Sequence, residues 1–179
     1  MTKSPEGTPS PEAAALARIV AAEFRRRLLT EQLPRIRHCL AVLGDAAPGD
    51  AAVWQRPSPN CNSVGNLVLH LCGNTTQWIL ATFGAAPDSR DRAAEFAAAG
   101  GLDATALGDR LAGVYTLACA AVDAAAVTDL LRERTVQGRY RETGLSAVLH
   151  VLEHSSGHAG QIYAWTKQVT GRDLRFYDL

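Results

Sequence analysis

Apolar residues in this chain are grouped into four long stretches with helical spacing, separated by segments rich in proline, glycine or charge. The first stretch begins at Ser10-Pro11-Glu12, where a capping serine, a proline and an acidic residue form a typical helix start. We expect this helix to run to about Leu43, with a kink near Pro34 because proline removes a backbone donor. Gly44 is then expected to end it.

The same pattern predicts three further helices, over residues 62–83, 103–125 and 145–170. Two prolines predict a loop over residues 53–60. Residues 84–101 are predicted to form a charged crossover with one short helical turn. Residues 134–141 are polar, and we expect an irregular connection there rather than a β-hairpin. The alanine- and leucine-rich composition, 47% hydrophobic but only 6% aromatic, also favours helix over sheet.

Three of the five histidines, His150, His154 and His158, recur at intervals of four residues. On a helix, residues four apart share a face and lie about 6 Å apart along the axis, so two adjacent imidazoles can bind one metal ion. The first and last of the three are about 12 Å apart, too far for two metal bonds of about 2.1 Å. The ligands would therefore be one adjacent pair, either His150 and His154 or His154 and His158.

A fourth histidine, His70, lies among leucines in the second predicted helix. Considered alone, it is expected to be a hydrogen-bonded core residue. Two facing helices can nevertheless bring one histidine from one helix and a pair from the other to a common point. Three neutral imidazoles leave coordination positions open, which is typical of a catalytic or ligand-accepting site rather than a closed structural one.

Two blocks carry these histidines, NSVGNLVLHLCGN at residues 62–74 and EHSSGHAGQI at residues 153–162. Together with Gln77-Trp78-Ile79, Thr166-Lys167 and residues 173–178, they resemble the DinB-like superfamily of metalloproteins, over essentially everything after the first ten residues. The resemblance implies an all-α, up-and-down four-helix bundle. It also implies His70, His154 and His158 as the metal ligands, with His150 left out.

The chain departs from the resembled pattern around the second block. Ser155 and Gly157 stand where bulky or aromatic residues are expected, and Ala159 stands where many relatives carry arginine. With Ser156 and Gly160, these five small residues surround the two predicted ligands on the fourth helix. Each glycine costs about 1 kcal/mol relative to alanine inside a helix. The small residues predict either close approach of a neighbouring helix or a pocket above the metal.

Two amides lie near the predicted ligands, Asn66 one turn before His70 and Gln161 three residues after His158. Each could orient an imidazole or a metal-bound water, or could instead make a plain structural hydrogen bond. No carboxylate lies at helical spacing beside the ligands, because Glu153 points about 100° away from His154. The sequence therefore offers no evident general base.

A divalent ion held by three neutral histidines lowers the pKa of a bound water or thiol. Some members of the resembled superfamily are thiol-dependent S-transferases, which implies activation of a small thiol for transfer to a small-molecule electrophile. The alternatives are a metal-dependent hydrolase of a small molecule, and a non-catalytic metal-containing module for binding or oligomerisation. We expect zinc or nickel, although three imidazoles also suit copper and iron. The superfamily's habits and the alanine-rich helices lead us to expect a homodimer.

Charge and composition narrow the possible partners and locations. Eighteen basic and eighteen acidic side chains cancel, so we expect no nucleic-acid binding. No apolar stretch approaches the roughly 20 residues that span a bilayer. The four cysteines are scattered, which fits small, buried, reduced core residues. We therefore expect a cytoplasmic location. Residues 1–9 are expected to be a disordered leader and residues 10–179 a single domain. In the C-terminal tail, Leu174 and Phe176 are expected to pack onto the helices.

Overall fold

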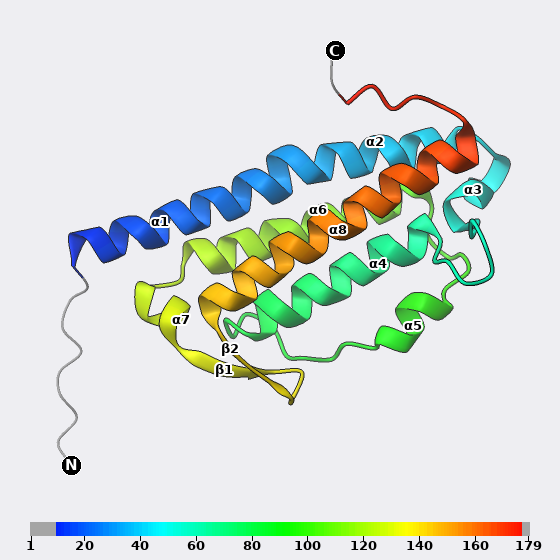
Figure 1. Cartoon of the computed structure of the whole chain (residues 1–179). Coiled ribbons are helices and arrows are strands. Elements are labelled where there is room, and N and C mark those ends of the chain that lie inside the picture. Colours follow the sequence, from blue (N-terminus) through cyan, green and yellow to red (C-terminus); the bar gives the residue numbers. More distant parts are fainter. Residues whose placement is uncertain (1–9, 177–179) are drawn as a thin grey trace.

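The computed structural model describes residues 10–176, which are mostly helical (Figure 1). Four long helical segments lie side by side: α1 (Pro11–Arg25) with η1 (Arg26–Gln32) and α2 (Leu33–Gly44); α4 (Val64–Thr75) with η3 (Thr76–Ala81); α6 (Ala104–Asp123); and α8 (Gly144–Thr170). Shorter elements connect them: η2 (Pro48–Asp50), α3 (Ala51–Trp54), α5 (Arg92–Ala97), α7 (Val127–Leu131), β1 (Glu133–Val136) and β2 (Tyr140–Thr143).

The core lies between the four long segments. α2 and α4 each contact both α6 and α8, so the apolar face of every segment is covered by neighbours. The largest fully buried side chains come from all four: Phe24, Leu28, Ile36, Leu40, Leu43, Leu67, Leu71, Ile79, Leu107, Leu111, Tyr115 and Ile162. The Tyr115 hydroxyl hydrogen-bonds the Ser155 side chain inside this core, which satisfies two buried polar groups together.

Helix boundaries follow the sequence expectations closely. The Ser10, Asp103 and Thr143 side chains each accept a backbone N–H at the start of a helix. Gly171 ends α8 with φ of 66°, a left-handed conformation that glycine adopts without a steric cost. Between α1 and α2 the helix is π-helical over η1, which ends at Gln32, and Pro34 lies in the first turn of α2, where its missing N–H costs no hydrogen bond.

Two local expectations were wrong. The segment expected to be irregular, residues 134–141, belongs to a hairpin of residues 133–143, in which Glu133 pairs with Thr143 and Val136 pairs with Tyr140. Gln137 and Gly138 both have positive φ at its turn, so a single glycine, without the usual Asn-Gly or Asp-Gly pair, allows the chain to reverse. The loop expected over residues 53–60 begins later, because α3 extends to its fourth residue, Trp54.

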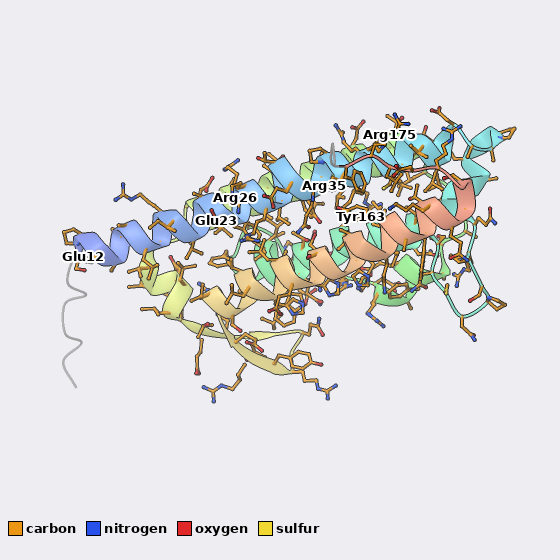
Figure 2. All side chains as sticks on the ribbon, turned by 45° about the horizontal axis from the view of Figure 1, so that its top comes forward. Glu12, Glu23, Arg26, Arg35, Tyr163 and Arg175 are labelled. Atoms are coloured by element: carbon orange, nitrogen blue, oxygen red, sulfur yellow. The ribbon has the colours of Figure 1, made fainter. Side chains whose placement is uncertain are left out.

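The described part of the tail packs against the helices, as expected. Leu174 is only 2% exposed, and the Phe176 ring meets the Tyr163 ring edge-on with 4.8 Å between centroids. Figure 2 shows Arg35 and Tyr163 on the side of the molecule where this tail runs. The predicted leader, residues 1–9, lies outside the described residues, as do residues 177–179.

The cysteines and the helix lengths bear on two further expectations. Cys39, Cys72 and Cys119 are buried and free, as expected, but Cys61 is partly exposed, in the loop that precedes α4. Within residues 10–176, no helix is both long and apolar enough to cross a membrane.

Candidate metal centre

The centre is a seam between two antiparallel helical segments, α4–η3 and α8, which contact each other along their length. Residues spaced by four face one another across it. The Nε2 atoms of His70 and His154 are 3.0 Å apart, and the Asn74 amide nitrogen lies 3.2 Å from His150 Nε2. One turn further along, the His150 ring stacks on Trp78 with 3.6 Å between centroids. The fourfold spacing on both segments therefore produces a continuous polar and aromatic strip.

Three histidines of this seam converge at one point. One ring nitrogen from each of His70, His154 and His158 lies within 4.8 Å of the other two, and we call these three residues the histidine cluster. The separation is comparable with the roughly 4.2 Å that two metal–nitrogen bonds can span. His150 stands outside the cluster, one turn along α8. The structure thus brings together the three residues that the resemblance implied.

His70 is held from behind by a carboxylate that comes from a distant part of the chain. Its Nδ1 atom is 2.9 Å from Glu95 Oε2, and both side chains are nearly inaccessible to solvent. Arg90 Nη2 lies equally close to Nδ1 and donates to Glu95 Oε2 at 2.9 Å. A carboxylate oxygen can only accept a hydrogen bond, so its contact with Nδ1 requires the proton to be on Nδ1. Nδ1–H therefore donates to the carboxylate, and the Nε2 lone pair is left facing the cluster.

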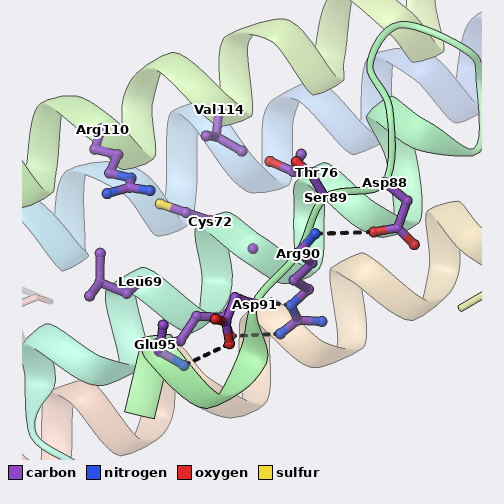
Figure 3. A pocket seen from close by; sticks show the side chains of 12 residues that line it. Leu69, Cys72, Thr76, Asp88, Ser89, Arg90, Asp91, Glu95, Arg110 and Val114 are labelled. Carbon is purple, nitrogen blue, oxygen red and sulfur yellow. Dashed lines mark hydrogen bonds and ion pairs between the residues drawn. The ribbon is translucent and has the colours of Figure 1, made fainter. Parts of the chain in front are cut away.

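Opposing effects set the charge of Glu95. Burial acts to raise the pKa of its carboxyl group, but hydrogen bonds from Arg90 and His70 outweigh it and hold the pKa below the usual value. Arg90 Nε donates to Glu95 Oε1 at 2.7 Å, and Figure 3 shows this pair beside α4. The close approach needs Gly73, because a Cβ atom there would lie 1.8 Å from Glu95 Oε1.

Asn66 positions the short helix that carries Glu95. Its side-chain amide donates to the backbone carbonyls of Glu95 at 3.0 Å and Ala98 at 2.7 Å, and its carbonyl oxygen accepts from the Ser63 backbone N–H. All of these bonds lead to α5 and to the cap of α4 rather than to the His70 ring. Of the two roles considered for Asn66, the structure displays the structural one.

The surroundings of His158 and His154 differ from those of His70 in their hydrogen-bond partners and in their effect on pKa. His158 Nδ1 lies 2.7 Å from the Gln161 side-chain oxygen, which accepts its proton and turns Nε2 towards the cluster. Burial lowers the pKa of His158, opposed in part by this bond. Burial, together with the neighbouring His158 and His70, lowers the pKa of His154 to about 3. His154 and His158 are therefore neutral near pH 7, the state in which imidazole binds metal.

The donor set fits a divalent cation. Two of the three rings have their Nδ1–H engaged by Glu95 and Gln161, so their bare Nε2 atoms point into one small volume. Converging lone pairs repel one another unless a cation lies between them. Engagement of the outer nitrogen by a carboxylate or carbonyl oxygen is also the arrangement that holds metal-binding histidines in proteins.

The small residues of α8 were expected to allow either close approach of a neighbouring helix or a pocket above the metal, and the glycines among them do neither. Ser155 and Ala159 are buried in the core, but Ser156, Gly157 and Gly160 are exposed. A Cβ atom built at Gly157 or Gly160 would meet nothing within 4 Å among the described residues. These glycines therefore neither receive a neighbouring helix of the same chain nor open a pocket above the histidine cluster.

Arg90 and Glu95 were not identified from the sequence. The sequence pattern showed a charged crossover and a short helical turn, and both are present, with Asp91 capping α5. The sequence pattern does not reveal that this segment folds back onto α4, because the fold-back depends on Gly73, Asn66 and contacts 25 residues apart in the sequence. No carboxylate lies at helical spacing beside the ligands, as the sequence indicated, but Glu95 reaches His70 from a distant segment.

Comparison with known proteins agrees with this geometry. No curated protein matches the chain. Among solved structures, the fold is similar to that of a DinB-like protein from Bacillus cereus ATCC 10987, with a TM-score of 0.57 and 15% identity, over 78% of this chain and 86% of that one. Residues 28–162, which include all three histidines of the cluster, match the sequence profile of the DinB superfamily, and the chain belongs to that superfamily.

Proposed function

We propose that this protein is a divalent-metal-dependent enzyme that activates a small thiol for transfer to a small-molecule electrophile. The observation that carries the proposal is the convergence of one ring nitrogen from each of His70, His154 and His158 within 4.8 Å. These side chains would hold zinc or nickel. Bound there, the ion would supply a Lewis acid that keeps a coordinated thiol in its reactive thiolate form near neutral pH.

The chain's own residues orient and neutralise the site. Glu95 fixes the tautomer of His70, and Gln161 does the same for His158. Because all three rings bind as neutral ligands, they leave the full charge of the ion to stabilise an anionic nucleophile. Buried Arg90 offsets the Glu95 charge, so the carboxylate orients His70 without adding net negative charge to the site.

The absence of a free base favours thiol transfer over hydrolysis. Within residues 10–176, Glu95 is the carboxylate that hydrogen-bonds the histidine cluster, and Arg90 and His70 already engage it. Hydrolysis benefits from a base that can remove a proton from water. A coordinated thiolate is itself the nucleophile and requires no such group, so hydrolysis and a non-catalytic module remain the alternatives that the experiment must exclude.

Metal analysis of untagged protein tests the site. Replacing His70, His154 or His158 by alanine should reduce the bound metal strongly, whereas His150→Ala should leave it nearly intact, because His150 lies outside the cluster. A wild-type protein that retains no divalent metal after equilibration and desalting would contradict the proposal. Loss of metal in His150→Ala with retention in His158→Ala would contradict the ligand assignment.

Thermal shift with small thiols then tests the chemistry. A thiol that coordinates the metal should raise the melting temperature of the metal-loaded protein and leave the metal-free protein unchanged. The His154→Ala variant is the control, since it should not respond in either condition. No response to any small thiol, with hydrolysis of ester or amide substrates by the loaded protein, would favour the hydrolase instead.

The proposal also includes the arrangement of the four long segments and the location of the protein. We infer that the four long segments form a four-helix bundle, which their mutual contacts support. The up-and-down order implied by the resemblance is wrong, because α4 and α6 run in the same direction and are joined by the long crossover that contains α5 (Figure 1). A cytoplasmic location is supported by four free cysteines, since a reducing compartment keeps thiols unpaired.

We also propose that the protein is a homodimer. A groove of about 910 Å³ between α1–η1 and α8 is supported as its interface by apolar lining residues that include Ile19, Leu149 and Leu152. Gly160 lies in this groove with open space above it, so a helix of a second copy could approach closely there.

A further inference from the structure

A hollow separate from the groove between α1–η1 and α8 lies near the histidine cluster, beside the crossover of residues 84–101. It has a volume of about 310 Å³ and is lined by Gln77, Asp88, Ser89, Arg90, Arg92 and Gln137. The hairpin turn and the segment before α5 therefore meet around one space. Because Arg90 also lies 2.9 Å from His70 Nδ1, this hollow is separated from the cluster by a single side chain.

Two of the charged groups around this hollow are already satisfied within the protein. Arg90 donates to Glu95 Oε1 and, through Nη1, to Gln77 Oε1 at 3.0 Å. Asp88 accepts from the Gln77 amide at 2.9 and 3.0 Å and from the Arg90 backbone N–H. The charge of Arg90 is therefore already paired with Glu95, whereas Asp88, among the described residues, accepts only from neutral donors and keeps its negative charge.

Arg92 differs from Arg90 in its contacts. Among the described residues it makes no ion pair, and its guanidinium group lies over the Phe96 ring, 4.8 Å from the centroid. The Phe96 ring is in turn 4.7 Å from the His70 ring. Arg92 is therefore separated from His70 by the Phe96 ring.

We propose that Arg92 and this hollow bind an anionic group of the small-molecule substrate, a carboxylate or phosphate-like oxyanion. The planar guanidinium group binds such oxyanions through two parallel hydrogen bonds, and Ser89 and Gln137 offer neutral partners around it. The volume suits one small polar group. An anion held here would place the rest of the substrate beside the histidine cluster.

The charge of the loaded site points to the same ligand class. Three neutral imidazoles would leave the charge of a divalent cation uncompensated. Around the hollow, Asp88 balances Arg92 and Glu95 balances Arg90, so the net positive charge of the loaded site would come from the ion. A site of this sign attracts anions and repels cations. The inference rests on the proposed metal-dependent function for its substrate, but binding at Arg92 can be measured separately from metal binding.

The test is titration of inorganic phosphate and acetate into metal-loaded protein by calorimetry, with Arg92→Gln and Arg92→Lys as variants. The matched control is Arg110→Gln, an exposed arginine on α6 that lines a different pocket (Figure 3). We expect Arg92→Gln to weaken binding of both probes by about tenfold or more, as loss of a charge-assisted bond should. Arg92→Lys should retain part of the affinity, and Arg110→Gln all of it.

Metal content and melting curves of every variant separate the possible failures. Wild-type protein without metal contradicts the proposed function, but the phosphate titration of that protein still measures the Arg92 site. If metal is bound and Arg92→Gln binds both probes as tightly as wild type, the anion subsite is wrong. No detectable binding of either probe to the wild-type protein at tens of millimolar would overturn it as well.

Discussion

His70 is constrained on both sides of its ring, by Glu95 at Nδ1 and by His154 at Nε2. Local spacing placed His70 in a buried helix and predicted an adjacent histidine pair on α8, and the resemblance to the DinB-like superfamily implied which pair joins His70. The contact with Glu95 could not be foreseen in this way, since it depends on where a non-periodic segment folds back. At the scale of single residues, the metal ligands could be predicted, whereas Glu95, the residue that orients His70, could not.

Glu95→Gln tests that support. The glutamine oxygen can still accept from His70 Nδ1–H, but the negative charge that strengthens this bond is lost, and buried Arg90 loses its partner. We expect metal affinity to fall by roughly 10- to 100-fold, the usual effect of losing a group that orients a metal ligand. Competition with a metal indicator measures this change. Glu133→Gln, an exposed carboxylate on β1, is the control, and equal affinities for the two variants would contradict the role of Glu95.

At the scale of elements, boundaries set by caps and glycines were predictable and long-range contacts were not. The caps of α6 and the stop of α8 at Gly171 follow from local hydrogen bonding and backbone sterics. The β1–β2 hairpin was missed because its turn has one glycine preceded by Gln137, which tolerates a positive φ less readily than asparagine. Likewise, the position of α5 depends on the missing side chain of Gly73 in α4, an effect invisible in a helical pattern.

Gly73→Ala separates this packing effect from helix propensity. In an open helical position, replacing glycine by alanine stabilises a protein by up to about 1 kcal/mol. At Gly73 the new Cβ atom would lie 1.8 Å from Glu95 Oε1, so α5 must move away from α4. We expect lower stability in urea unfolding and weaker metal binding. Gly113→Ala on α6, with no atom within 4 Å of its added Cβ, should instead be stabilising. A stabilised Gly73→Ala protein with unchanged metal affinity would contradict this account.

At the scale of the whole molecule, most large apolar side chains are enclosed, and two of the exposed ones line the same groove. Ile19 is 60% exposed and Leu149 51% exposed, and both line the groove between α1–η1 and α8. A groove this large and apolar is unusual on a surface that remains in water. Its lining carries both signs of charge, Glu153 on α8 and Arg27 on η1, so two copies related by a twofold axis could pair opposite charges.

We therefore expect a dimer mass for the wild-type protein in light scattering at tens of micromolar. Ile19→Asp should give a monomer, because it would bury a charge in the centre of an apolar interface. Leu117→Asp is the matched control: Leu117 is also 60% exposed but lies on α6, outside the groove, so this variant should remain dimeric. A wild-type monomer would refute self-association. A dimer that survives Ile19→Asp but dissociates in Leu117→Asp would move the interface to α6 and leave the groove for another partner.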